Sequence, residues 1–107
     1  MNIVLVGLMG SGKTAVGRLL AERLGRPLVD TDALVEEAAG CTIAEIFAAE
    51  GEEGFRRREA EAVARAAAGD NQVIATGGGA VLRPGNREAL RSSGLVIWLD
   101  AEPESLY

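Results

Sequence analysis

The chain has 107 residues, of which 48% are hydrophobic and 25% charged, with a formal net charge of −5. These values fit one small globular domain, and the acidic balance argues against a nucleic-acid partner. No apolar stretch approaches the roughly 20 residues of a membrane span, and no signal peptide is visible, so we expect no membrane partner. The single cysteine, Cys41, excludes an internal disulfide and favours a cytoplasmic location. Histidine is absent, which excludes mechanisms that need imidazole.

Alternating apolar and amphipathic segments predict strands and helices in turn along the chain. Strands are expected over residues 2–6, 27–29, 72–75 and 95–99. Helices are expected over residues 13–24 and 32–39. A further helix is expected to begin after a capping box at Thr42 and Glu45, and another to run from Gly51 to about residue 68. The last two are expected from Pro84 to near Gly94 and from Pro103 onward. This alternation predicts an α/β fold with a mainly parallel sheet.

The segment from Gly7 to Thr14 reads Gly-Leu-Met-Gly-Ser-Gly-Lys-Thr, the spacing of a phosphate-binding P-loop. The preceding strand and the following helix, with apolar positions at Ala15, Val16, Leu19, Leu20 and Leu24, supply the context that the motif needs. A glycine-rich turn without a ligand is therefore the weaker interpretation. Lys13 is the only lysine among 11 basic residues, and its compact ammonium suits a position between phosphates better than a guanidinium.

Asp30-Thr31-Asp32 follows the second expected strand, and ligands of parallel α/β sheets bind at such strand ends. One carboxylate there could hold magnesium through water while the other accepts a hydrogen bond from a substrate hydroxyl. The alternative is that Asp30 or Asp32 caps the next helix. The residue types alone favour neither interpretation.

Phe55-Arg56-Arg57-Arg58-Glu59 lies on the long expected helix, where at most one or two arginines can face a pocket. Phe55 beside Arg56 suits a ring that bears a carboxylate. The alternative, favoured for this cluster alone, is a solvated face paired with Glu52, Glu53 and Glu59. Gly77-Gly78-Gly79 follows the third strand and indicates close backbone approach, either to a ligand or within a tight turn.

Taken together and in this order, these motifs resemble the shikimate kinase family, and the resemblance extends over the whole chain. It implies a P-loop NTPase-type parallel sheet flanked by helices, like that of the small nucleoside monophosphate kinases. It also implies transfer of the γ-phosphoryl group of ATP to the 3-hydroxyl of shikimate, a step of aromatic amino acid biosynthesis, with Mg²⁺ as cofactor.

The resemblance assigns roles to individual residues. Lys13 and Asp32 are the implied catalytic residues, Lys13 at the transferring group and Asp32 at the attacking hydroxyl. Thr14 and Asp30 are the implied magnesium residues. ATP binding is implied for Gly10, Ser11, Gly12, Lys13, Thr14 and Ala15, and substrate binding for Asp32, Phe55, Arg56, Gly77, Gly78 and Gly79, with Phe47 as a further ring contact.

The chain departs from the family pattern at its C-terminal side. The family's lid arginine, second carboxylate-binding arginine, adenine-contacting residues and fifth strand would lie beyond Tyr107. We therefore expect residues 1–107 to form one incomplete P-loop kinase domain that is marginally stable and prone to associate, whereas the complete enzyme is expected to be monomeric. Asp100, which resembles a Walker B residue, is interpreted as a strand-end cap.

Two other functions compete with this one. A gluconate kinase-like enzyme of the same fold would explain the P-loop but not Phe55-Arg56 followed by three glycines. A non-catalytic nucleotide-binding fragment would explain the missing lid, but Lys13, Thr14 and Asp32 weigh against it.

Overall fold

The computed structural model describes residues 1–7, 11–77 and 79–99, and leaves out the side chains of residues 11–14, 81 and 99. Four parallel strands form one sheet: β1 (Asn2–Gly7), β2 (Leu28–Asp30), β3 (Val73–Ala75) and β4 (Gly94–Leu99), in the order β2-β3-β1-β4. The helices are α1 (Ser11–Leu24), α2 (Thr31–Ala39), α3 (Ile43–Ala68) and α4 (Pro84–Ser93), with a 3₁₀ turn, η1 (Ala80–Leu82). Most expected boundaries are thus confirmed within one or two residues; the helix expected from Pro103 lies outside the described residues.

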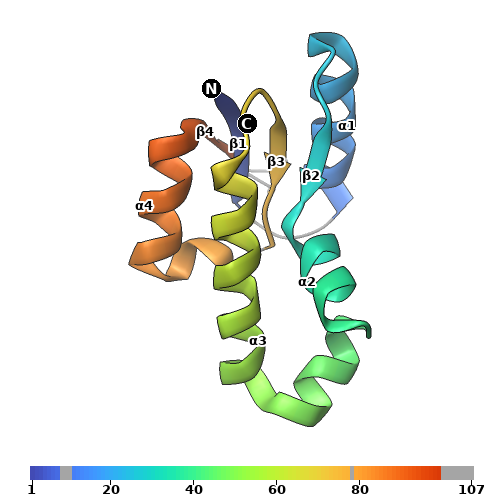
Figure 1. The fold of residues 1–107 in the computed structure, drawn as a ribbon. Coiled ribbons are helices and arrows are strands. Elements are labelled where there is room, and N and C mark those ends of the chain that lie inside the picture. The colour runs from blue at the N-terminus through green and yellow to red at the C-terminus, as the bar shows by residue number, and fades with distance from the viewer. Residues whose placement is uncertain (8–10, 78, 100–107) are drawn as a thin grey trace, which may run out of the picture.

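The helices cover both faces of the sheet (Figure 1). Val4 and Val6 of β1 point to one face, where they pack with Val63 of α3 and Leu90 of α4. Leu5 points to the opposite face, as the alternation of a strand requires, and there α1 approaches closely at Gly17. Val4, Leu5 and Val6 are fully buried, so β1 is the centre of a three-layer α/β core.

The apolar positions predicted for α1 are less buried than an amphipathic pattern implies. Val16, Leu19 and Leu24 expose 37%, 52% and 48% of their surface, and Leu20 is half-buried. The helix touches the sheet through Gly17, where an added Cβ would lie 3.0 Å from the side chain of Leu28. This close approach fixes the rotation of α1, so that Val16 and Leu19 turn away from the sheet. The predicted helix is confirmed, but the prediction of which of its side chains are buried was wrong.

The expected capping box begins α3 as predicted. The Thr42 hydroxyl accepts a hydrogen bond from the Glu45 amide at 3.1 Å, and the Thr42 amide donates to Glu45 Oε1 at 2.9 Å. The two helices expected on either side of Gly51 are joined into α3, with a kink where Gly51 adopts φ 71° and ψ −176°. Glycine is required there because side-chain-bearing residues avoid this backbone conformation.

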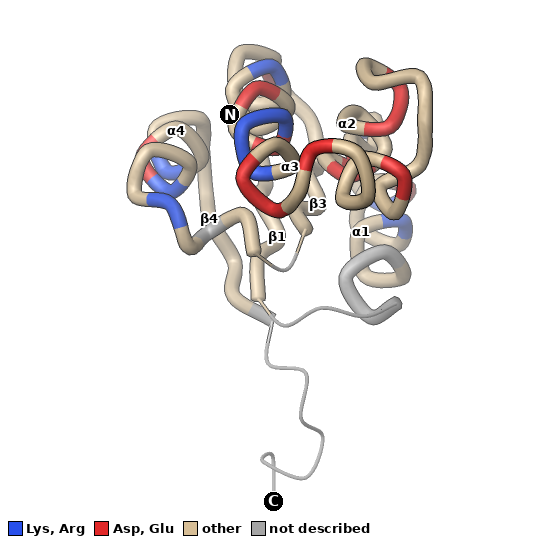
Figure 2. The backbone as a smooth tube through the Cα atoms, turned by 90° about the horizontal axis from the view of Figure 1, so that it is seen from below, with Lys and Arg blue, Asp and Glu red and all other residues tan. Residues whose placement is uncertain are grey.

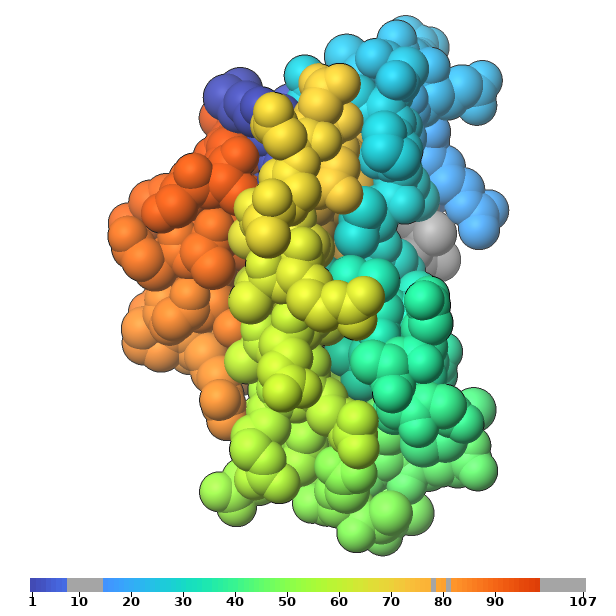
Figure 3. Space-filling view, in the orientation of Figure 1, coloured from blue at the N-terminus to red at the C-terminus, as the bar shows by residue number. Residues whose placement is uncertain are grey.

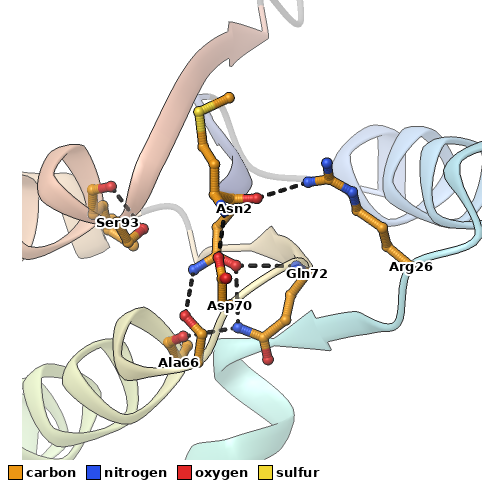
Figure 4. Close-up of polar contacts among 9 residues, drawn as sticks. Asn2, Arg26, Ala66, Asp70, Gln72 and Ser93 are labelled. Carbon is orange, nitrogen blue, oxygen red and sulfur yellow. Dashed lines mark hydrogen bonds and ion pairs between the residues drawn. The ribbon is translucent and has the colours of Figure 1, made fainter.

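A polar network fixes the amino end of the sheet (Figure 4). Asn2 is fully buried; its Nδ2 donates to the Gly69 carbonyl and its Oδ1 accepts from the Gln72 amide, both at 3.0 Å. Gln72 Nε2 donates to the Ala66 carbonyl at 3.0 Å. These bonds tie the start of β1 to the segment between α3 and β3. The opposite, carboxyl edge of the sheet is where β1, β2 and β3 end side by side, with Leu5 and Asp30 both aligned with Ala75.

Candidate active site

The P-loop lies at the carboxyl end of the central strand. β1 ends at Gly7, which has φ 130°, and α1 begins at Ser11, so the predicted strand and helix on either side of the motif are present, while residues 8–10 lie outside the described residues. Ser11, Gly12, Lys13 and Thr14 form the first turn of α1, whose backbone N–H groups have no partner within the helix. That turn holds no acidic residue, so its positive end suits an anion. Gly10 lies outside the described residues, as do the side chains of Lys13 and Thr14.

Asp30 caps α2, which was one of the two interpretations left open by the sequence. Its Oδ1 accepts hydrogen bonds from the amides of Asp32, at 2.9 Å, and Ala33, at 3.4 Å. This cap fixes the direction in which α2 leaves β2. Asp32 follows in the first turn of α2, and the intervening Thr31 is fully buried.

At this edge of the sheet, the segment just after β3 forms hydrogen bonds to the elements on both sides of it. The Gly77 amide donates to Thr31 Oγ1 at 3.2 Å, and Thr76 Oγ1 donates to the Leu5 carbonyl at 3.0 Å. The segment that enters the glycine run therefore lies between the start of α2 and the end of β1. Sequence reasoning missed Thr31 and Thr76, although their small hydroxyl side chains at two strand ends were visible.

Asp32 and Arg56 lie against Gly77 and Gly79, respectively. A Cβ added to Gly77 would lie 2.5 Å from Asp32 Oδ1, and one added to Gly79 would lie 2.6 Å from Arg56 Nη2. Both glycines therefore leave room for a charged side chain that comes from another element. The structure brings together four predicted substrate residues from α2, α3 and the end of β3; Gly78 lies outside the described residues.

Of the three neighbouring arginines, Arg56 is the one that faces the glycine run. Arg56 Nη1 donates to Glu59 Oε1 at 2.8 Å, and Nη2 lies 3.5 Å from Glu52 Oε2. Arg57 is exposed, and Arg58 pairs instead with Glu50 at 2.8 Å. The hydrogen bond to Glu59 raises the pKa of Arg56, so its guanidinium stays charged at any physiological pH.

Glu59 is 1% exposed and is therefore a buried carboxylate whose charge is matched by Arg56. Sequence reasoning placed Glu59 within the Phe55–Glu59 motif and among the partners of a solvated face, but gave it no role of its own at the site. Its spacing of three residues from Arg56 is that of neighbours on one helix face, so the pair was detectable, but its burial was not.

Aromatic rings line the other side of Arg56. The Arg56 Cζ atom lies 5.3 Å from the centre of the Phe55 ring, and that ring stacks on Phe47 with centroids 4.8 Å apart. Phe55 is 6% exposed and Phe47 is 40% exposed. The two rings join the helical segments before and after the Gly51 kink, and present an apolar wall beside a fixed cation.

The oxygen ligands expected for magnesium are of the right chemical type. Aspartate and threonine oxygens suit Mg²⁺, which is commonly held by one or two protein groups together with phosphate oxygens and water. The residues that the structure describes contain no group of three or more His, Cys, Asp or Glu side chains that could hold a metal alone.

None of the described helices is long and apolar enough to cross a membrane.

A parallel sheet with a P-loop after its central strand, and with charged side chains gathered at the carboxyl edge, defines a P-loop kinase-like α/β protein. The shikimate kinase family model matches residues 9–107, and the chain belongs to the shikimate kinase family.

Similar proteins agree with this assignment. A shikimate kinase of Symbiobacterium thermophilum is 87% identical over 107 residues, which are 100% of this chain and 62% of that protein. The structure of shikimate kinase from Acinetobacter baumannii in complex with shikimate matches with a TM-score of 0.92 at 48% identity, over 96% of this chain and 57% of that one. A gluconokinase from Sinorhizobium meliloti matches with a TM-score of 0.61 at 24% identity, over 98% of this chain and 60% of that one, which shows a shared fold alone. The chain thus spans about three fifths of the length of these relatives.

Proposed function

We propose that this protein transfers the γ-phosphoryl group of ATP to the 3-hydroxyl of shikimate, giving 3-phosphoshikimate and ADP. The observation that carries the proposal is the placement of Asp32 and Arg56 against two glycines at the end of β3, next to the strand that leads into the P-loop. A carboxylate and a guanidinium held at one strand edge suit a ligand with hydroxyl groups at one end and a carboxylate at the other. Membership of the family supports the same substrate.

On this proposal the first turn of α1 binds the phosphates. The backbone N–H groups of residues 10–15 bind phosphate oxygens, and Lys13 stabilises the charge on the transferring group. Thr14 would ligate Mg²⁺ directly and Asp30 would support it through water. Because Asp30 Oδ1 already caps α2, its other carboxylate oxygen is the one proposed to face the hydrated metal.

Asp32 is proposed to hold the hydroxyl groups of shikimate and to accept a proton. The 3-hydroxyl oxygen attacks the γ-phosphorus, the bond from that phosphorus to the bridging oxygen of ADP breaks, and the hydroxyl proton passes to Asp32. Arg56 pairs with the shikimate carboxylate, Phe55 lines the ring, and the glycines at 77–79 offer backbone to the substrate. Such a reaction needs positioning and electrostatic stabilisation more than covalent chemistry.

The bulk properties support a protein that acts in the cytoplasm. A single cysteine, an acidic net charge and the lack of a long apolar stretch in the sequence are consistent with a cytoplasmic enzyme of small-molecule metabolism. A monomeric state of the complete enzyme is part of the same proposal.

Calorimetric titration of shikimate in the presence of Mg-ADP tests the substrate. Saturable binding is expected. Arg56→Ala should weaken the binding free energy of shikimate by about 2–5 kcal/mol, because the carboxylate of shikimate would lose a desolvated ion pair. Arg57→Ala is the matched control, since Arg57 is exposed and should leave the affinity unchanged. Arg56→Lys, compared by circular dichroism with the unsubstituted chain, separates lost recognition from lost folding. Binding of Mg-ADP without any binding of shikimate would favour a nucleotide-binding module instead.

A further inference from the structure

A groove between α2 and α3 lies apart from the residues proposed to bind shikimate. It has a volume of about 390 Å³, and none of the residues lining it belongs to the proposed substrate or phosphate site. The two helices pack side by side on the face shown in Figure 3. A concave surface of this size accommodates a small metabolite.

The floor of the groove is aliphatic. Leu34, Val35 and Ala38 contribute from α2, and Ala62 contributes from α3. Val35 and Ala62 are buried, with 1% and 4% of their surfaces exposed, whereas Ala38 is exposed. Small side chains at Ala38 and Ala62 leave the hollow, and Leu34 and Val35 make it apolar. The floor therefore favours a branched aliphatic group.

The rim carries three charged side chains, Arg58, Glu61 and Arg65. Arg58 also interacts electrostatically with Glu61, whereas Glu61 and Arg65, both among the described residues, form no ion pair with one another. Glu61 and Arg65 both line the groove and are four residues apart on α3, a spacing at which such residues commonly form an ion pair. Within the described part of the chain, the ion pairs join other residues, and neither Glu61 nor Arg65 takes part in one. Arg58, also on the rim, is engaged with Glu50 through Nε and Nη2. Figure 2 shows the mixture of acidic and basic segments along α3.

We propose that this groove binds a small zwitterion with an aliphatic body, that is, a free α-amino acid of the leucine type. Arg65 receives the carboxylate, Glu61 receives the ammonium group, and the side chain lies on the aliphatic floor. A simple anion would meet repulsion from Glu61, and a simple cation would meet repulsion from Arg65. A ligand with both charges satisfies both residues, which gives the groove its specificity.

The test is a titration of the ¹⁵N-labelled chain with L-leucine, followed by amide chemical shifts. Isocaproate, which lacks the ammonium group, and isopentylamine, which lacks the carboxylate, are titrated in parallel. We expect saturable shifts on α2 and α3 with L-leucine at millimolar concentration, and binding weaker by about tenfold or more for each analogue. Absence of saturable shifts with L-leucine overturns the site, and equal affinity for either analogue overturns its specificity for a zwitterion.

Substitutions locate the binding without touching the proposed active site. Arg65→Gln and Glu61→Gln should each weaken L-leucine by about tenfold, and Ala38→Phe should abolish binding by filling the groove. Arg57→Gln is the control, since Arg57 is exposed on the same helix but does not line the groove. Unchanged affinity in Arg65→Gln and Ala38→Phe would place L-leucine elsewhere and overturn the proposal. The measurement needs neither shikimate nor nucleotide, so its result is independent of the proposed kinase activity.

Discussion

Arg56 is fixed by contacts within the protein on three sides. Glu59 accepts a hydrogen bond at 2.8 Å, Glu52 lies at 3.5 Å, and the ring of Phe55 is 5.3 Å from the guanidinium carbon. A side chain that is already held in one orientation loses less conformational entropy when a ligand binds. If Arg56 binds the substrate carboxylate as proposed, its affinity should therefore depend on Glu59, a residue that need not touch the ligand.

Replacing Glu59 by glutamine tests this dependence. Glu59→Gln keeps the shape but turns a charge-assisted hydrogen bond into a weaker one. We expect the dissociation constant for shikimate to rise by about tenfold while that for Mg-ADP stays the same. Both constants are measured by calorimetry. Glu53→Gln, an exposed change on the same helix, is the control; equal effects of the two substitutions would show that Glu59 has no special role.

Gly79 leaves the space that the Arg56 guanidinium occupies. In Gly79→Ala, the new Cβ would lie 2.6 Å from Nη2, so the arginine must move while the main fold is kept. We expect shikimate affinity to fall by about tenfold or more with little change in urea midpoint. Gly85→Ala serves as the comparison, because a Cβ added there would meet no neighbouring atom within 4 Å and alanine favours the helix. Unaltered shikimate affinity in Gly79→Ala would separate Gly79 from the site.

At the scale of the elements, the kink in α3 determines which groups meet. Gly51 interrupts the helix, and beyond it the chain folds back so that Glu50 and Arg58, eight residues apart, form an ion pair. The same turn stacks Phe47 on Phe55. An uninterrupted helix would place Glu50 and Arg58 about two turns apart, too far for direct contact.

The Glu50–Arg58 pair makes part of the stability depend on pH. The hydrogen bond from Arg58 lowers the pKa of Glu50 below its ordinary value of 4.5. A carboxylate with a lowered pKa in the folded state contributes stability that is fully present above the ordinary value and is lost as the pH falls through the lowered one. Urea unfolding should thus show the unsubstituted chain more stable than Glu50→Gln at neutral pH, with the difference narrowing below pH 4.5. A difference that is constant with pH would contradict the contribution of this pair.

Much of the fold was predictable because its signals are local. The capping box of Thr42 and Glu45, the left-handed Gly40 after α2 and the order of strands and helices all follow from neighbouring residues. The buried face of α1 could not be predicted in the same way, because the close approach at Gly17 depends on Leu28, which belongs to the next strand.

The site was predictable as a set of residues but not as an arrangement. The residue pattern alone left open which arginine faces the glycine run, whereas the resemblance pointed to Arg56, whose guanidinium lies against Gly79 and is paired with the buried Glu59. The cap made by Asp30 was likewise one of two open interpretations until the direction of α2 was known. The roles of these residues in phosphoryl transfer remain predictions.

At the scale of the whole molecule, the sheet gathers segments from distant parts of the chain. The ends of β1, β2 and β3 lie in register at one edge, which brings Gly7, Asp32 and Gly77 to the same edge of the sheet. The same sheet has two outer strands, β2 and β4. β2 has only three residues, whereas β4 has six and exposes 50% of Leu95 and 65% of Trp98. A long, apolar outer strand is a surface on which chains associate.

We therefore expect the 107-residue chain to associate through β4 as its concentration rises. Sedimentation velocity should show a weight-average mass that increases with concentration, and Trp98→Lys should move it toward the monomer, because a charge on an edge strand opposes pairing. Leu82→Lys is the matched control: Leu82 is 72% exposed but lies in η1, outside the sheet. An equal effect of both lysines would indicate a general effect of charge in a chain of net charge −5, and a monomer at all concentrations would contradict association through β4. Because Trp98 lies at the far side of the sheet order from β2, its substitution should leave shikimate binding at the Asp32–Arg56 site unchanged.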